Sequence, residues 1–175
     1  IDGEATSEYS ASSISLSSDG SRVAIGAMGN DGNGTNSGHV RIYQYNNNSW
    51  SQLGADIDAE AAGDQTGSSV SLSSDGSRVA IGAYANDGNG SNSGHVRIFD
   101  YNGSAWVQVG ADIDGEQTGD YSGMSSVISS DGSRVAIGAQ FNNNENGISS
   151  GHVRVYTLSP GESYQYAWDV DNGNN

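Results

Sequence analysis

Short runs in which apolar and polar residues alternate mark most of the chain, and none has the spacing of an amphipathic helix. Ile14 and Leu16 alternate with serines, which is the pattern of a half-buried β-strand. A second run at residues 22–27 places valine and isoleucine on one face and only alanine and glycine on the other. A strand with such a small face lets another backbone approach closely. These patterns predict an all-β protein.

The same pattern of strands occurs three times. The string Ser-Ser-Asp-Gly-Ser-Arg-Val-Ala-Ile-Gly-Ala recurs at intervals of 56 residues, with its aspartate at Asp19, Asp75 and Asp131. The segment Gly-His-Val-Arg follows each copy, with its histidine at His39, His95 and His152. A four-stranded unit repeated at this period is typical of β-propellers, because one blade alone cannot bury both of its faces.

Each unit divides into four strands, which in the first copy lie near residues 14–16, 22–27, 39–43 and 50–57. The Asp-Gly pair between the first two strands predicts a two-residue hairpin turn with positive φ at both positions. We therefore expect three tandem four-stranded antiparallel blades of a β-propeller in one repeat domain, 1–175. The blades should span approximately 5–57, 61–113 and 117–171. An open stack or filament of the same sheets is the alternative.

The third unit departs from the other two. It is lengthened around residues 159–161, and residues 166–170 form an imperfect last strand. The chain also opens in the middle of a motif, as a processed or excerpted protein would.

The alternation also predicts which residues are buried. We expect the core to contain valines and isoleucines of the second and third strands: Val23, Ile25, Val40, Ile42, Val79, Ile81, Val96 and Ile98. Trp50 and Trp106 should pack between blades. The three histidines diverge around the propeller axis, too far apart to share one zinc ion. Each is expected to be a strand-end residue with a backbone hydrogen-bond partner.

Charge narrows the possible partners. The formal net charge is −15, and the only basic residues besides histidine are six arginines. Binding to nucleic acid or to an anionic membrane needs clustered cations, so both are unexpected. No apolar run reaches the roughly 18–20 residues that membrane insertion of a helix needs. Cysteine is absent, which excludes disulfides and thiolate metal sites.

The second unit resembles the FG-GAP repeats of integrin-α-type propellers. The likeness lies in residues 67–83, in the segment Gly-His-Val-Arg-Ile-Phe at 94–99 and in Trp-Val-Gln-Val-Gly at 106–110, and it extends over nearly the whole chain. It implies an extracellular or cell-surface location, a role in adhesion and recognition, and calcium in blade loops.

The strongest candidate chemistry is a repeated set of carboxylates. They occupy relative positions 1, 3, 5 and 9 of two equivalent loops: Asp56, Asp58, Glu60 and Asp64, and Asp112, Asp114, Glu116 and Asp120. Calcium prefers six to eight hard oxygen ligands from a flexible loop, so calcium is the expected cofactor. The alternative is a solvated acidic turn.

Four Asn-x-Ser/Thr sequons fall in expected loops and are candidate glycosylation sites: Asn33, Asn47, Asn89 and Asn102. Every conspicuous residue recurs in register, whereas a catalytic site needs an asymmetric set of groups, so no enzymatic activity is expected. We expect an extracellular structural or adhesion module that self-associates, including as a fibre, or forms part of a larger propeller. A calcium-dependent carbohydrate-binding propeller, with glycans as partners, is the alternative.

Overall fold

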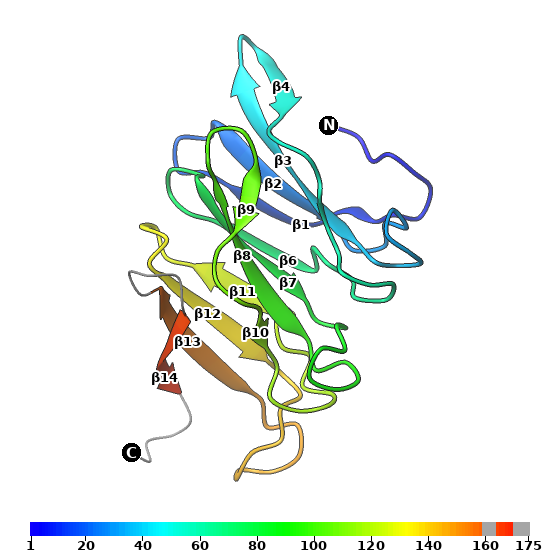
Figure 1. Cartoon of the computed structure of the whole chain (residues 1–175), viewed down its shortest axis with the longest axis vertical. Helices are drawn as coiled ribbons and strands as arrows, with labels where there is room; N and C mark the ends of the chain where they lie inside the picture. The colour runs from blue at the N-terminus through cyan, green and yellow to red at the C-terminus, as the bar shows by residue number, and fades with distance from the viewer. Residues whose placement is uncertain (159–163, 170–175) are drawn as a thin grey trace.

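Three twisted antiparallel sheets follow one another along the long axis of the molecule (Figure 1). The computed structural model describes residues 1–158 and 164–169. All fourteen elements assigned there are strands, and no helix in this part could cross a membrane. The expected all-β fold is confirmed.

The first sheet has the strand order β1-β2-β3-β4, with β5 paired to β3. Its strands are β1 (Ser10–Leu16), β2 (Arg22–Ala27), β3 (His39–Asn46), β4 (Ser49–Gln52) and β5 (Ile57–Asp58). The second sheet repeats this plan with β6 (Ser69–Leu72), β7 (Arg78–Ala83), β8 (His95–Tyr101), β9 (Trp106–Gln108) and β10 (Ile113–Asp114). The expected single fourth strand is therefore two short strands. Gly54, with φ of 81°, lies between β4 and β5, and β5 pairs with the other end of β3.

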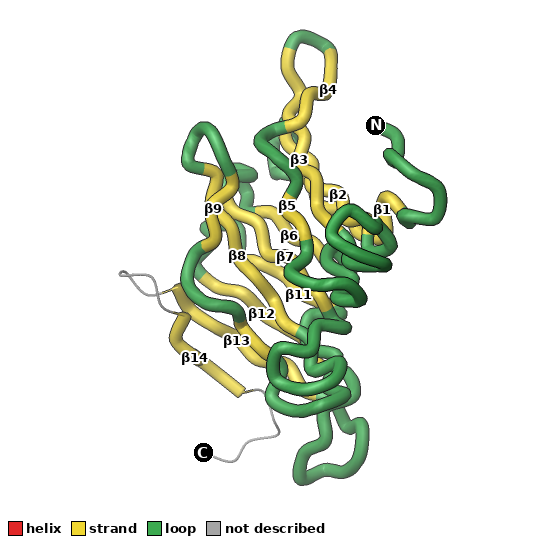
Figure 2. The backbone as a smooth tube through the Cα atoms, turned by 45° about the vertical axis from the view of Figure 1, so that its right-hand side comes forward, coloured by secondary structure: helices red, strands yellow, loops and turns green. Residues whose placement is uncertain are grey.

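The third sheet consists of β11 (Ser125–Ile128), β12 (Arg134–Ala139), β13 (His152–Leu158) and β14 (Tyr164–Asp169), in that order. β14 occupies the place of the expected imperfect last strand, with Trp168 opposite Val155. Val170 and the expected lengthening at residues 159–161 lie outside the described residues. Figure 2 shows the long loops of all three sheets gathered along one edge of the stack.

The Asp-Gly hairpins differ from the expected two-residue turn. Ser17 N–H donates to the carbonyl of Arg22 (2.9 Å), which leaves a four-residue loop in which only Gly20 has positive φ. The Asp19 carboxylate accepts hydrogen bonds from the Ser21 backbone (2.9 Å) and the Ser17 hydroxyl (2.7 Å). These bonds, the backbone one first, lower the pKa of Asp19 to about 2. Asp19 thus closes the loop through its side chain, and its own φ is not positive.

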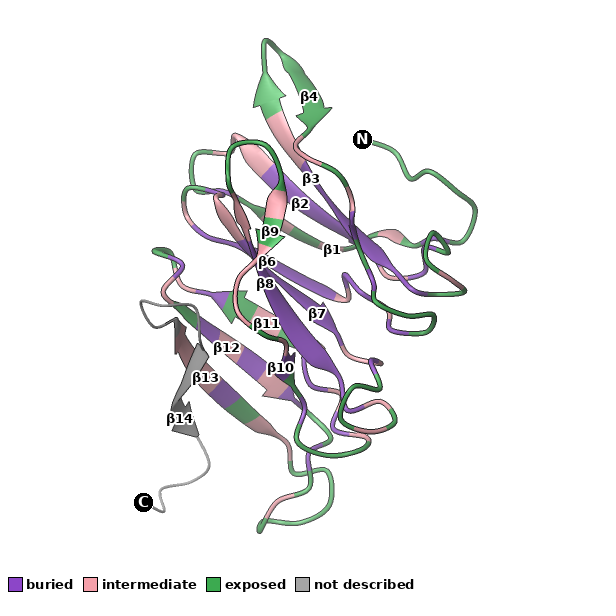
Figure 3. Ribbon diagram, viewed as in Figure 1, coloured by how far each residue is buried: buried purple, intermediate pink, exposed green. Residues whose placement is uncertain are grey.

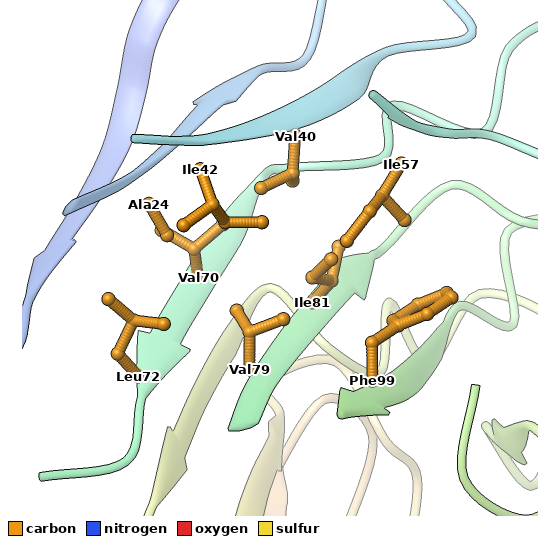
Figure 4. Close-up of a cluster of buried hydrophobic side chains, with 9 residues drawn as sticks. All are labelled: Ala24, Val40, Ile42, Ile57, Val70, Leu72, Val79, Ile81 and Phe99. Atoms are coloured by element: carbon orange, nitrogen blue, oxygen red, sulfur yellow. The ribbon is translucent and has the colours of Figure 1, made fainter. Parts of the chain in front are cut away.

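The core lies between the sheets, where two unlike faces meet. We call leading face the side of a blade that carries the large residues of its first two strands, and trailing face the opposite side. Between blades one and two, a trailing face meets a leading face in one cluster: Ala24, Val40, Ile42 and Ile57 against Val70, Leu72, Val79, Ile81 and Phe99 (Figure 4). Blades two and three repeat this contact. All eight predicted core residues are buried.

Candidate functional site

The leading face of the first blade is open along β1, although Val23 and Ile25 of β2 are buried. Ile14 and Leu16 are 61% and 58% exposed, whereas their counterparts Val70 and Leu72 in the second blade are both 8% exposed. Figure 3 shows the contrast between the two strands, with β6 buried and much of β1 exposed. Two large apolar side chains exposed on the same face of β1 form the kind of patch that marks a contact surface.

The two tryptophans show the same contrast. Trp106 packs against the core between blades one and two, and its indole N–H donates to the carbonyl of Leu53 in the first blade (2.8 Å). Trp50, the counterpart in the first blade, is 38% exposed. The expectation of packing between blades is confirmed for Trp106 and is wrong for Trp50, because within the described residues no blade lies beyond the leading face of blade one.

The trailing face of the third blade is open as well. Val127 and Val153 are exposed there, beside a hollow of about 360 Å³ whose lining includes Met124, Gly138 and His152. The two open faces of the molecule are therefore of opposite kinds, one leading and one trailing.

Gly138 shows what this hollow would receive. Its counterparts Gly26 and Gly82 lie under the backbone of the next blade, and a Cβ on either would approach the carbonyl oxygen of Gly67 or Gly123 to 2.0 Å. At Gly138 the nearest atom to such a Cβ is 3.6 Å away, in its own blade. The position at which a following blade docks in the two internal contacts is thus unfilled in the third blade.

In neither of the two expected calcium loops do the four carboxylates lie together as the ligands of one ion. Asp64 and Asp120 are buried, and each accepts a backbone hydrogen bond within its own loop, from the N–H groups of Ala61 and Gln117 (both 2.9 Å). Asp120 also accepts from the side-chain amide of Asn142 (2.9 Å). These two aspartates therefore hold the loop conformation.

The remaining acids of these loops lie close to the three histidines. Among the described residues, three groups bring three possible ligand atoms within 4.8 Å of one another: Glu4, Glu8 and His39; His39, Asp56 and Asp58; and Glu60, His95 and Asp112. None of them joins three carboxylates of one expected loop. Of the acids in the second loop, Asp114 is exposed, and Glu116 lies 3.7 Å from His152 Nδ1.

The histidines lack the backbone partners expected of them. The Nε2 atoms of His39, His95 and His152 are buried without a hydrogen bond, and His95 Nδ1 is also without one. Burial, with the positive charge of Arg97 as the second cause, lowers the pKa of His95 from 6.5 to about 4. His95 is therefore a neutral imidazole near neutral pH. The prediction of a backbone partner for these atoms is wrong.

All four sequons lie on exposed loop residues. Asn47 and Asn102 follow β3 and β8, at the tips of hairpins. The side-chain amides of Asn33 and Asn89 instead donate to the backbone of the following acidic loop, at Ala59 (2.7 Å) and Gly115 (2.8 Å). A glycan on either nitrogen would compete with that bond, which favours Asn47 and Asn102 as acceptors.

The central part of the chain is similar to a known protein family. The model of the FG-GAP repeat matches residues 57–99, from β5 through most of β8. The matched segment contains both Glu60 and His95. No curated protein matches the sequence.

Solved structures similar to this chain are β-propeller proteins. They include a putative 6-phosphogluconolactonase from Bacteroides uniformis (TM-score 0.59), a hypothetical selenium-binding protein from Sulfolobus tokodaii (0.54) and the hydrazine synthase of Kuenenia stuttgartiensis (0.52). Each is 13% identical, and the matches cover 93%, 85% and 97% of this chain. The chain spans only 41%, 38% and 39% of theirs. The likeness concerns the fold alone.

Proposed function

We propose that this chain is a structural propeller module, without catalytic activity, that associates head to tail with copies of itself through its two open faces. The leading face of one copy covers the trailing face of the next. Such a heterologous contact closes into a ring or continues as a fibre, depending on the rotation between copies. Propellers typically contain about four to eight blades, so two three-bladed copies would complete a six-bladed ring.

The observation that carries the proposal is the unfilled position over Gly138. Each internal contact combines a trailing face with a leading face, and one face of each kind remains open at the ends of the described chain. A second copy therefore offers the open trailing face a surface with the same strand plan as the surfaces packed inside the molecule. Covering the exposed Ile14, Leu16 and Trp50 would add apolar burial.

Two residues make the contact between copies differ from the internal ones. Ala11 stands where the other blades have Gly67 and Gly123, and it has the same left-handed backbone, with φ of 69°. A Cβ at Gly67 would approach the carbonyl oxygen of His39 to 2.6 Å. Ala11 therefore requires a slightly wider approach.

The second difference is Val127, which replaces a serine. Ser15 and Ser71 each accept a hydrogen bond from the next blade, from the backbone N–H groups of Leu72 (2.9 Å) and Ile128 (3.0 Å). A valine cannot accept one, so the contact between copies has one hydrogen bond fewer.

The test is sedimentation velocity of the 175-residue chain over a range of concentrations. We expect wild type to associate as concentration rises, and Gly138→Ala to stay monomeric with an unchanged melting temperature. In the monomer the added methyl group makes only ordinary van der Waals contacts, with Ser125 of its own blade, whereas in the docked state it would meet a backbone carbonyl. Ala11→Gly should strengthen association, because it removes the Cβ that widens the contact.

The control is Ile148→Ser, which removes an 88% exposed apolar side chain from a loop and should leave association unchanged. A wild-type chain that stays monomeric at every concentration would overturn the proposal. So would a Gly138→Ala variant that associates like wild type. Electron microscopy of the associated form then separates a ring from a fibre.

The proposed setting is extracellular, at or near a cell surface, with adhesion as the role of the assembled module. Its support is the FG-GAP repeat at residues 57–99 together with the net charge of −15, which keeps such a surface soluble and disfavours nucleic acid as a partner. Immunolabelling of intact cells of the source organism tests this location, and label confined to the cell interior would refute it.

A further inference from the structure

Three side chains from two consecutive repeats meet at the loop edge of the second blade. Glu60 follows β5, His95 is the first residue of β8, and Asp112 directly precedes β10. His95 Nδ1 lies 3.8 Å from Asp112 Oδ2 and 4.0 Å from Glu60 Oε2. Two carboxylate oxygens and one imidazole nitrogen thus face a common point.

The Nδ1 atom of His95 has no hydrogen-bond partner. The residue is 1% exposed, and neither ring nitrogen has a hydrogen-bond partner. The two carboxylate oxygens are beyond hydrogen-bond length. A buried polar atom without a partner is rare in folded proteins and costs free energy, so its position between two carboxylates points to a ligand that all three atoms contact.

Neighbouring side chains hold the two carboxylates in this orientation. The Gln108 side-chain amide donates to Asp112 Oδ1 (2.7 Å), which leaves Oδ2 toward His95. Arg97 Nη1 lies 3.9 Å from Glu60 Oε1, and Arg97 is itself fixed by donating to the carbonyl of Asp58 (2.7 Å). Partners of this kind orient the ligands of metal sites in proteins.

We propose that Glu60, His95 and Asp112 bind a divalent transition-metal ion, zinc first among them, with water completing the coordination. A tetrahedral zinc ion with bonds of about 2.0–2.2 Å places its ligand atoms roughly 3.3 Å apart. The distances of 3.8 and 4.0 Å from His95 Nδ1 to the two carboxylate oxygens therefore need to shorten by roughly half to three-quarters of an ångström. The side chains of Glu60 and Asp112 are 46% and 28% exposed, which gives them the freedom to move. The imidazole nitrogen and the small number of oxygens disfavour calcium, which takes six to eight oxygen ligands.

The other two repeats have parts of the same arrangement. In the first repeat, Asp56 lies 3.6 Å from His39 Nδ1. Glu4 instead forms an ion pair of 2.8 Å with Arg41. Glu4 and Asp56 do not join one group there. Among the residues whose side chains are described, the second repeat alone brings an acid from each neighbouring loop together with its histidine, so one strong site per chain is expected.

Isothermal titration calorimetry of the chelator-stripped chain with zinc chloride tests the site. We expect one saturable site, weakened roughly tenfold or more by Glu60→Gln or Asp112→Asn, as for residues that contact or orient a metal. Asp114→Asn is the matched control, since it removes the same charge two residues from Asp112. It should change the affinity by no more than about threefold, because surface charges contribute weakly.

Nuclear magnetic resonance of the imidazole groups supplies a second readout. The His95 resonances should shift on addition of zinc in wild type, and the Asp112→Asn variant should need roughly tenfold or more zinc for the same shift. Because Glu60 and Asp112 are partly exposed, their variants test the site even if a His95 substitution fails to fold. Titrating the monomeric Gly138→Ala variant separates this proposal from self-association, on which it does not depend.

Three results would overturn the proposal. The first is the absence of saturable zinc binding. The second is zinc binding that Glu60→Gln and Asp112→Asn leave unchanged. The third is calcium binding that Asp114→Asn abolishes while zinc leaves the His95 resonances in place, which would instead support the calcium loops expected from the sequence.

Discussion

Leu16 and Leu72 form a matched pair that tests the stacking of blades directly. They occupy the same position of the first strand, 56 residues apart, and differ in that a preceding blade covers only Leu72. Leu72 is 8% exposed and Leu16 is 58% exposed. Leu72→Ala should lower the free energy of unfolding by about 2–4 kcal/mol, through lost transfer energy and a residual cavity. Leu16→Ala should lower it by about 0.5 kcal/mol or less, as at other exposed sites.

The measurement is urea unfolding followed by tryptophan fluorescence and circular dichroism. The Gly138→Ala background is used so that folding is measured on the monomer. Equal losses of stability in the two variants would refute the stacking argument, because the described fold gives Leu16 no covering blade. In a chain that retains Gly138, Leu16→Ala should also weaken association, whereas Leu72→Ala should act on folding alone.

Two further predictions concern side chains that hold the hairpins. Hydrogen bonds, first from the Ser77 backbone, lower the pKa of Asp75. Its contribution to stability is therefore present above the unfolded value near 4 and is lost as pH falls through the lowered folded value. Thermal melts of Asp75→Asn should thus show a weaker acid dependence below pH 4 than wild type, and an unchanged profile would refute this role. Arg78 donates to the carbonyl of Gly132 in the next blade (2.7 Å), so Arg78→Lys should cost about 1 kcal/mol in urea unfolding. Arg78 also bonds Asp100 in its own blade, whereas the residue opposite Arg134 is Thr157. Arg134→Lys, in the last blade, should therefore cost almost nothing, and equal costs would contradict the role of these two contacts of Arg78.

Much of the fold could be predicted from the sequence because strand periodicity and repetition agree. The run at residues 22–27 matches β2 from end to end, since alternating branched residues and the following glycine-rich loop limit it on both sides. The fourth strand was predicted less well. Its break depends on Gly54 and on the pairing of β5 with the far end of β3, and such long-range pairing leaves no local pattern.

The grouping of the acids could not be predicted from their local spacing. That spacing placed Glu60 and Asp112 in two separate loops, each with its own set of carboxylates. The structure brings both to Nδ1 of His95 instead. β10 pairs with β8 at His95, and Arg97 of β8 donates to the carbonyl of Asp58, two residues before Glu60. A signal was nevertheless present, since in the first two repeats the histidine has a glutamate 35 residues before it and an aspartate 17 residues after it.

Identical stretches of sequence have different surroundings inside the stack of blades and at its ends. Gly26, Gly82 and Gly138 stand in identical strings, yet only the first two are covered by a following blade. Two of the residues that break the repeat, Ala11 and Val127, lie on the open faces, where they add one Cβ and remove one hydrogen-bond acceptor. The proposed contact between copies should therefore be weaker than either internal contact, even though it would join the same kinds of face. It follows that the three blades of one chain should remain stacked while the proposed assembly dissociates on dilution, so association and folding should be separable by concentration alone.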